Sequence, residues 1–326
     1  MSGKLIDGFK IGHLTDGAGA TGVTVVLCEK GATPGVDVRG AAPGTRETDL
    51  MRPENLVDRV HGIVLAGGSA FGLAAADGVV HWLEERGHGW PTSTGVVPIV
   101  ASAILYDLGV GDGKARPDAA MGHQACNNAT SATPQTGSVG AATGATVAKA
   151  LGMERCFKGG LGFAEQELAS GIRVQVVVAV NAVGSIVDPA SGTVIAGPRD
   201  EEGTMLAPLD AYRSGDTLKA QGLVGEATTL AVVMTSGELS KQEATRVAIM
   251  AQAGISRAVV PAYTLGDGDT VFVMASGEKA LQAGELSSLG AIAAAATADA
   301  IVSGVRSAQP VAGIPAAAEH AGPLAL

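Results

Sequence analysis

Short, nearly uninterrupted runs of apolar residues recur along the chain and predict buried β-strands. These runs occupy Gly22–Glu29, Gly62–Ala66, Val174–Val180, Leu230–Val233 and Val271–Met274. A loop rich in Gly and Pro is expected between the first run and Gly44. The third run contains one polar residue, Gln175, and ends at Asn181.

Other segments space their apolar residues near the helical period of about 3.6. A helix is expected over Phe71–Arg86, ending at Gly87, and with the preceding strand it forms a strand, glycine turn and helix unit. Its core-facing stripe comprises Phe71, Ala74, Ala75, Val79, Trp82 and Leu83. Ser240 and Glu243 form a capping box that opens another helix, for which Gly254 is the expected stop. Further helices are expected over Pro53–Val60, Thr136–Leu151 and Ser287–Val305.

The remaining long segments lack a clear period. Gly197–Val224 mixes charges, Gly and Pro, which predicts a surface loop or mobile linker. The tail from Gln309 to Leu326 holds three Pro residues and is expected to be extended or frayed. Because no repeat and no linker between independent units is visible, we interpret residues 1–326 as one domain.

The composition is typical of a globular protein packed with small side chains. Hydrophobic residues make up 46% and charged residues 17%, while 47 Gly accompany only five Phe, three Tyr and two Trp. The net charge of −10 argues against a nucleic-acid surface, which needs clustered Lys and Arg to neutralise phosphates. We therefore expect no nucleic-acid partner.

Targeting, membrane and metal signals are weak in this sequence. Charges interrupt the apolar residues of Met1–His13, so no signal peptide is indicated and a cytoplasmic protein is expected. Leu289–Val305 is interrupted by Asp299 and Gly304, which favours a buried helix over a membrane span. The three Cys are widely spaced and the six His form no metal-binding spacing, so neither a disulfide framework nor a metal or other cofactor is predicted.

Thr228 stands at the entrance to the apolar run Leu230–Val233. A residue at the start of a strand is held rigidly by the strand and is open toward the preceding loop, which suits a nucleophile. Threonine is also β-branched and fits a strand without any catalytic role. Both interpretations of this stretch remain open from the residues alone.

Asp267 and Asp269 flank Gly268 and lie on the same side of an extended chain. Two carboxylates so placed can raise the pKa of one of them and serve acid/base chemistry. The residues alone favour an ordinary turn, since Asp-Gly is a common turn dipeptide. A metal-binding pair is disfavoured, because a calcium loop needs further oxygen ligands nearby.

Three further features have both a structural and a catalytic interpretation. Gly67, Gly68 and Ser69 lead from a strand into a helix, where free N–H groups could hold an oxyanion or where glycines simply permit close packing. Lys158, among glycines, could be an exposed loop residue or a buried cation beside a nucleophile. Asn181 could cap a turn or donate its amide to an oxyanion.

Five ordered motifs together resemble the self-cleaving family of L-aminopeptidase/D-esterases, β-peptidyl aminopeptidases and nylon-oligomer hydrolases. The resemblance covers most of the chain. The motifs are Gly40–Leu50, Ala66–Leu73, Lys158–Gly162, Thr228–Leu230 and Asp267–Phe272.

The resemblance implies an α/β protein with a four-layer αββα sandwich, assembled as a tetramer or larger homo-oligomer. It implies self-cleavage between Ala227 and Thr228, which yields residues 1–227 and 228–326 and makes Thr228 the new N-terminus and nucleophile. Lys158 and Asn181 match the supporting lysine and asparagine of the family, and Asp267 and Asp269 match its acidic pair. The implied substrate is a small amide or a short peptide, with no cofactor and no membrane partner.

Two positions depart from the family pattern. The residue before the nucleophile is often Asn and here is Ala227, which has no side chain to assist the cut, and Gly266 replaces bulkier residues. Two other functions therefore remain as alternatives. One is acyl transfer to an amine, as in the similarly folded ornithine acetyltransferases, and the other is an uncleaved binding protein without catalysis.

Overall fold

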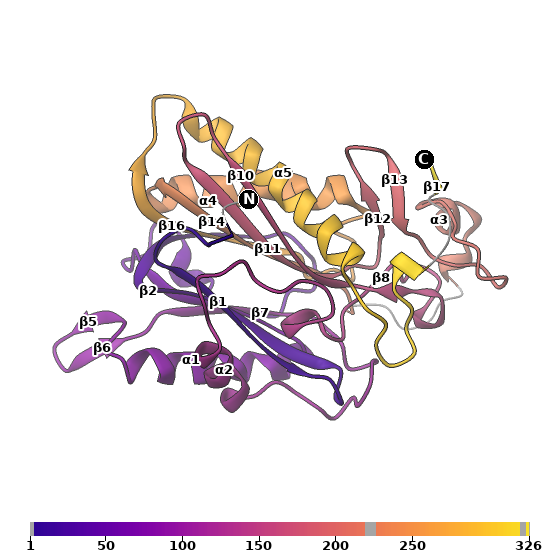
Figure 1. Ribbon diagram of the computed structural model, residues 1–326, viewed down its shortest axis with the longest axis horizontal. Helices are drawn as coiled ribbons and strands as arrows, with labels where there is room; N and C mark the ends of the chain where they lie inside the picture. The colour runs from indigo at the N-terminus through magenta and orange to yellow at the C-terminus, as the bar shows by residue number, and fades with distance from the viewer. Residues whose placement is uncertain (1–2, 219–225, 320–323, 326) are drawn as a thin grey trace.

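The protein is a sandwich of two facing β-sheets with helices on both outer faces (Figure 1). The computed structural model describes residues 3–218, 226–319 and 324–325. Strand β2 (Thr21–Val38) joins the two sheets, because its first part pairs with β1 and β4 while its second part pairs with β16. The four-layer αββα sandwich expected from the family resemblance is therefore confirmed.

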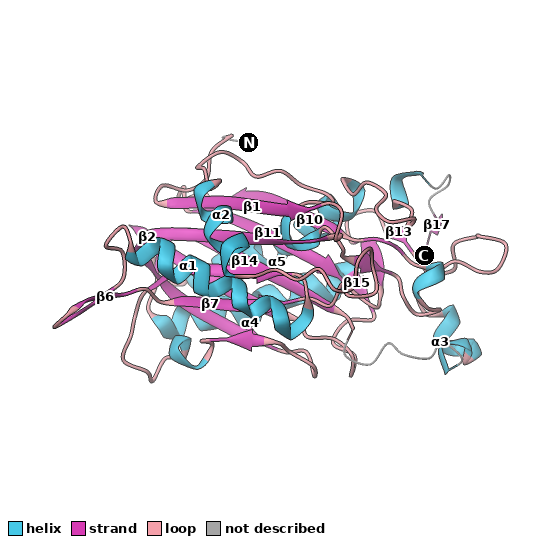
Figure 2. Ribbon diagram, turned by 90° about the horizontal axis from the view of Figure 1, so that it is seen from below, coloured by secondary structure: helices cyan, strands magenta, loops and turns pink. Residues whose placement is uncertain are grey.

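The first sheet contains β1 (Phe9–Asp16), β2, β4 (Val60–Ala66), β7 (Val100–Ile104) and β3 (Thr45–Arg46), and α1 (Ala75–Glu84) and α2 (Ala119–Asn127) cover it. The second sheet contains β10 (Gly160–Glu167), β11 (Arg173–Asn181), β14 (Thr228–Glu238), β16 (Thr270–Ala280) and the end of β2, and α4 (Lys241–Ala258) and α5 (Glu285–Arg306) cover it. Figure 2 shows α1 and α2 in front of the strands.

Smaller elements complete the chain. A four-stranded sheet is formed by β15 (Val259–Val260), β12 (Ser185–Asp188), β13 (Thr193–Ala196) and β17 (Leu324–Ala325). Two short pairs are β5 (Trp90–Thr92) with β6 (Gly95–Val97), and β8 (Thr146–Val147) with β9 (Phe157–Lys158). A short helix α3 (Asp210–Ser214) lies in the segment before the β14 strand.

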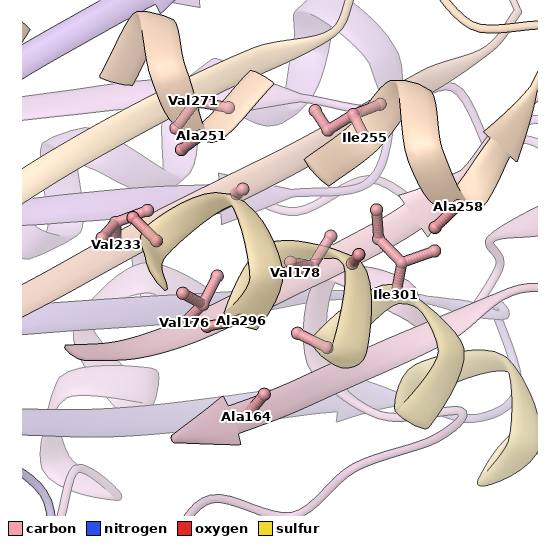
Figure 3. Close-up of a cluster of buried hydrophobic side chains, with 14 of the residues drawn as sticks. Ala164, Val176, Val178, Val233, Ala251, Ile255, Ala258, Val271, Ala296 and Ile301 are labelled. Carbon is pink, nitrogen blue, oxygen red and sulfur yellow. The ribbon is translucent and has the colours of Figure 1, made fainter. Parts of the chain in front are cut away.

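Three apolar layers follow from the alternation of side chains along each strand. On β14, Leu230 and Val232 face the first sheet and join the core between the sheets, whereas Ala231 and Val233 face the helices. Figure 3 shows this second side, where Val233 lies near Ala251 of α4 and Ala296 of α5. The buried strands expected from the apolar runs are therefore confirmed.

Glycines set the close contact between α5 and the second sheet. A Cβ on Gly162 of β10 would lie 1.7 Å from the Ala300 carbonyl oxygen, so only glycine permits this packing. The last helix expected from the sequence is confirmed as α5.

Although α5 is long and apolar enough to cross a membrane, it packs on α4, β10 and β11 as a core helix.

Some expected loops and helices differ in the structure. The Gly/Pro-rich segment after Glu29 continues as strand to Val38, because Gly35 lets the backbone of α4 approach the strand closely. The helix expected over Pro53–Val60 is wrong. Backbone carbonyls in and just before this segment point toward a lysine, and Lys241 Nζ donates hydrogen bonds to those of Leu50, Asn55 and Val57.

The helix expected over Thr136–Leu151 is also wrong. Gly137, Gly140 and Ala148 have φ angles of 94°, 53° and 59°, which a right-handed helix excludes. The segment instead forms a 3-10 turn, Gly140–Ala142, and the short strand β8. Its backbone is therefore free to bring single side chains, among them Lys149, into the interior.

Element ends also depart from expectation. The predicted helix over Phe71–Arg86 starts as a 3-10 turn, Ser69–Ala74, and Phe71 lies outside the core with its ring under the Arg116 guanidinium. The capping box of α4 is confirmed, but the helix continues past Gly254, whose missing Cβ allows α5 to approach.

The tail is more ordered than expected over its described part. Ala316 and Ala317 are buried, and β17 pairs with β13. Within Gly197–Val224 the described residues form turns and α3, in keeping with a surface segment, and residues 219–225 lie outside the described part.

Candidate active site

Three neighbouring strands bring polar residues together at one end of the second sheet, where the strands start or stop. β14 starts at Thr228, its antiparallel neighbour β11 ends at Asn181, and its parallel neighbour β16 starts directly after Asp267–Asp269. Asn181 is the register partner of Thr228. The topology therefore gathers four of the five catalytic candidates, Thr228, Asn181, Asp267 and Asp269, at the same end of this sheet.

Thr228 lies against the peptide bond that precedes it. Its side chain is only 4% exposed, and Oγ1 donates a hydrogen bond to the Ala227 carbonyl oxygen at 2.5 Å. Gly268 N–H donates to the same oxygen at 2.9 Å. Two donors therefore converge on the carbonyl of the bond between Ala227 and Thr228.

The acidic pair is buried beside this bond, with Asp267 next to Ala227 and Asp269 next to Thr229, and does not form an exposed turn. Asp267 forms a parallel bridge with Ala227, and one carboxylate oxygen of Asp269 accepts from Thr229 N–H at 2.6 Å. Both carboxylates are buried, and Gly40 packs on the loop with no room for a Cβ. The motifs around Gly40 and Asp267 therefore form one unit.

Burial makes the pair easy to protonate. Burial and the neighbouring Asp267 charge raise the pKa of Asp269 to about 7. Burial also raises the pKa of Asp267. Because two close carboxylates resist carrying two charges, the pair can retain one proton near neutral pH.

This pKa shift predicts a pH dependence of stability. With a pKa raised from 3.8 to about 7, folded Asp269 binds more protons than the unfolded chain between these values, so stability falls as pH rises through this window. Asp269→Asn should flatten the free energy of unfolding between about pH 4 and pH 7, measured by urea titration. The same replacement at exposed Asp7 is the control, and an unchanged slope in Asp269→Asn would contradict the shift.

Lys149 is a site residue that sequence reasoning missed. Its Nζ donates to Glu226 O at 2.8 Å and to both Asn181 O and Asn181 Oδ1 at 3.1 Å. The side chain is 1% exposed, and burial lowers the pKa of Lys149 to about 8. A lone lysine within the small apolar run Ala145–Leu151 was the available signal, but the helix expected there obscured it.

Lys158, the lysine that the family resemblance singled out, lies elsewhere in the interior. Its Nζ donates to the carbonyls of Thr143, at 2.8 Å, and Ala145. Burial lowers the pKa of Lys158 to about 7. These contacts hold the backbone that leads to Thr146, whose N–H binds Asn181 Oδ1. Among the described contacts, Lys149 rather than Lys158 reaches Asn181.

The Asn181 amide links several segments. Its Oδ1 accepts from Lys149 and from Thr146 N–H, while Nδ2 donates to Tyr106 O at 3.1 Å and to Glu226 O at 3.3 Å. In this structure Nδ2 thus donates to the carbonyl of Glu226, one peptide unit before that of Ala227, and not to the Ala227 carbonyl itself.

The N–H groups of the glycine turn, which were candidate oxyanion donors, already have acceptors in this structure. Gly67 N–H donates to Gly22 O, Gly68 N–H to an Asp107 carboxylate oxygen at 2.7 Å, and Ser69 N–H to Leu105 O. Since all three N–H groups are already bonded, the structural interpretation of Gly67, Gly68 and Ser69 as a packing turn is favoured.

A small cavity lies beside the site. It has a volume of about 50 Å³, and its lining includes Tyr106, Thr146, Lys149 and Glu226. Over the described residues, no group of three or more His, Cys, Asp or Glu is arranged to hold a metal ion. The site thus combines one hydroxyl, two carboxylates, an amide and an ammonium group.

Comparison with known proteins assigns the family. Residues 6–318 match the model of Peptidase family S58. The chain belongs to peptidase family S58. An uncharacterized aminopeptidase from Mycobacterium bovis is 41% identical over 344 residues, covering 95% of this chain and 95% of the relative. A 6-aminohexanoate-oligomer endohydrolase from Agromyces is 32% identical over 293 residues, covering 89% of this chain and 79% of that protein.

Solved structures support the S58 fold. A β-aminopeptidase from Burkholderia has a TM-score of 0.72 at 20% identity and covers 95% of this chain and 89% of its own. An L-aminopeptidase D-Ala-esterase/amidase from Ochrobactrum anthropi, a variant of the Ntn-hydrolase fold, has a TM-score of 0.71 at 17% identity and covers 96% and 88%. The family resemblance expected from the motifs is confirmed, and this S58 member is a peptidase that hydrolyses amide bonds.

Proposed function

We propose that this S58 peptidase is an N-terminal-nucleophile hydrolase that first cuts its own Ala227–Thr228 bond and then uses Thr228 on small amides or short peptides. The observation that carries the proposal is the convergence of Thr228 Oγ1 and Gly268 N–H on the Ala227 carbonyl oxygen. A nucleophile and an oxyanion donor at one carbonyl are the two parts that acyl transfer needs.

In the precursor, Thr228 Oγ attacks the Ala227 carbonyl carbon, and Gly268 N–H stabilises the developing negative charge on its oxygen. The carbon–nitrogen bond then breaks, the proton that the Thr228 hydroxyl gives up passes to the Thr228 nitrogen, and Ala227 is left as an ester on Thr228. Water opens this ester, which yields the Ala227 carboxylate and regenerates the Thr228 hydroxyl. Because Ala227 has no polar side chain, neighbouring groups must supply all the assistance.

In the mature enzyme, the free α-amine of Thr228 has a pKa of about 7.7–8.0 and can act as the base for its own hydroxyl. The buried Asp267/Asp269 pair beside Thr228 would orient the ammonium group and receive protons. The substrate acyl group passes to Thr228 Oγ, its amine leaves with a proton, and water releases the acid. In the uncleaved chain, Lys149 and Asn181 donate to the Glu226 carbonyl on the acyl side of this bond.

We further propose that the chain acts as a homo-oligomer of tetramer size or larger in the cytoplasm, without a cofactor. The likeness to L-aminopeptidases and oligomer hydrolases supports small amides and short peptides as substrates. Light scattering of the purified protein tests the assembly size.

Mass spectrometry of the purified protein tests the processing step. Fragments of residues 1–227 and 228–326 are expected, with Thr as the first residue of the second fragment. An intact chain that hydrolyses amides would contradict the mechanism. Products formed with an added amine separate the alternatives, since an acyl-amine product indicates a transferase, and an intact chain without hydrolysis indicates a binding protein.

A further inference from the structure

The loop of residues 261–266 binds both carboxylates of the acidic pair through its backbone. Tyr263 N–H donates to Asp269 Oδ2 at 3.3 Å, and Thr264 N–H donates to Asp267 Oδ2 at 2.6 Å. The other oxygen of Asp269 accepts from Thr229 N–H. An N–H group that donates to a carboxylate favours its charged form. The path of this loop therefore affects how readily the pair holds a proton.

Tyr263 has a backbone conformation that residues with a Cβ rarely adopt. Its φ angle is 57°, in the left-handed region. Such a conformation persists only where the surrounding structure fixes it. The direction of the Tyr263 N–H therefore depends on contacts made by the rest of the residue, and its side chain makes them.

The side chain of Tyr263 is fixed on helix α4. Its ring packs against the apolar layer between the second sheet and the helices, and its hydroxyl donates to the backbone carbonyl oxygen of Gln252. Gln252 Oε1 lies 3.2 Å from the same hydroxyl. Gln252 is itself 1% exposed, and its Nε2 donates to Asp37 O on β2 at 2.8 Å. The contact between Tyr263 and Gln252 therefore joins the loop to α4 and to β2.

We propose that Tyr263 is a positioning residue for the acidic pair. Its phenol, held by Gln252, keeps the loop backbone in the path that directs two N–H groups at the carboxylates, and the pair thereby gives up its proton more readily. The inference rests on the proposed function, in which the pair receives protons beside Thr228. Tyr263 acts through Asp269 and is not a catalytic residue.

Charges on the neighbouring elements stay in place when the phenol hydroxyl is removed. Burial and the Asp269 charge raise the pKa of Tyr263, so the phenol keeps its proton over the range in which the pair titrates. Tyr263→Phe removes no charge and no N–H group, so a changed protonation of the pair reports the position of the loop backbone. The titratable and charged groups that act on the pair and on Tyr263 are Lys149, Tyr212 on α3, and the ion pair of Asp37 and Arg39.

Infrared spectroscopy of the full chain in heavy water measures the protonation of the pair. The carbonyl-stretch band of a protonated carboxyl group that Asp269→Asn removes belongs to the pair. We expect the pH midpoint of this band to rise by about half a unit or more in Tyr263→Phe, because the carboxylate loses an N–H donor. Every protein compared also carries Thr228→Ala, so that self-cleavage does not differ between them. An unchanged midpoint in a folded Tyr263→Phe protein overturns the proposal.

Thr297→Val is the matched control for the loss of a buried hydroxyl. Thr297 is buried on α5, and its hydroxyl donates to a helix carbonyl oxygen, that of Ala293, at 2.8 Å. This variant should keep the parent midpoint, whereas an equal rise would assign the effect to a general loss of packing and overturn the proposal. If Tyr263→Phe does not fold, Gln252→Leu decides, because it removes the Oε1 contact and the bond to Asp37. A raised midpoint in Gln252→Leu supports the positioning role, and an unchanged one overturns it.

Hydrolysis by processed protein with Thr228 intact separates this inference from the proposed function. The pair must be charged to receive a proton, so Tyr263→Phe should lower kcat for L-alanyl p-nitroanilide about twofold or more at pH 7, with KM unchanged and kcat restored at about pH 9. The Thr228 amine titrates in both proteins and cancels in their ratio. A raised infrared midpoint without this loss would refute the pair as proton acceptor and keep the positioning role. If the wild-type protein hydrolyses no amide, the proposed hydrolase fails, and the infrared midpoint still decides the positioning role.

Discussion

Thr228→Ala is expected to leave the chain intact and to abolish hydrolysis. The hydroxyl that lies 2.5 Å from the Ala227 carbonyl oxygen is lost, while the strand around it keeps its pairing with Asn181. Removing a nucleophile from a site of this type costs about 10⁴-fold or more in rate. Intact mass and p-nitroaniline release measure the two effects.

Thr228→Ser should retain both processing and hydrolysis, because serine keeps the hydroxyl. Thr235→Ala is the matched control, since Thr235 is a buried threonine on the same strand whose hydroxyl donates to Arg173 O. This variant should still be processed. Fragments of residues 1–227 and 228–326 from Thr228→Ala would refute the nucleophile.

The sequence predicted the strands and the last helices well, because their patterns are local. Val174–Val180, apart from Gln175, and Leu230–Val233 are apolar at successive positions, because helices cover one face of their sheet and the other sheet covers the second face. The capping box of Ser240 and Glu243 is satisfied within one turn of α4. Such features need no knowledge of the rest of the fold.

The parts that the sequence could not predict depend on distant contacts. The segment around Lys149 contains small residues that suit a helix, but positive φ angles at Gly137 and Ala148 make it an irregular path. Lys149 therefore reaches Asn181, 32 positions along the chain, which no local period reveals. Lys158 was singled out by a motif of glycines that serves backbone packing.

In the candidate site, too, local sequence patterns could be predicted and contacts between distant residues could not. Asp267 and Asp269 are two positions apart in the sequence and could be proposed as a pair, and parallel pairing of β14 with β16 brings them to Thr228. By contrast, the residues alone left open whether the three N–H groups of Gly67, Gly68 and Ser69 are free to hold an oxyanion, and only the structure reveals their acceptors. The oxyanion donor that we propose is instead the backbone N–H of Gly268, which lies inside a motif chosen for its carboxylates.

Gly268→Ala is expected to slow self-cleavage by about 10²-fold, the cost of displacing reacting groups by about 1 Å. A Cβ at this position would lie 2.8 Å from Thr228 Oγ1 and 2.8 Å from Ala42 O. The methyl group therefore has rigid backbone on one side and the nucleophile on the other. Either the Thr228 hydroxyl or the Gly268 N–H must then turn away from the Ala227 carbonyl. The first movement displaces the proposed nucleophile, and the second removes the proposed oxyanion donor.

The time course of fragment formation, followed by intact mass, measures this effect. Gly17→Ala is the control, because nothing lies within 4 Å of a Cβ there, and it should process at the wild-type rate. The variant is expected to fold, because Gly268 precedes β16 and lies outside the apolar layers. Circular dichroism checks this and so distinguishes a slower reaction from misfolding. A folded Gly268→Ala variant that matured at the wild-type rate would show that Gly268 N–H and Thr228 Oγ1 need not meet at one carbonyl, and the precursor mechanism would then require another oxyanion donor.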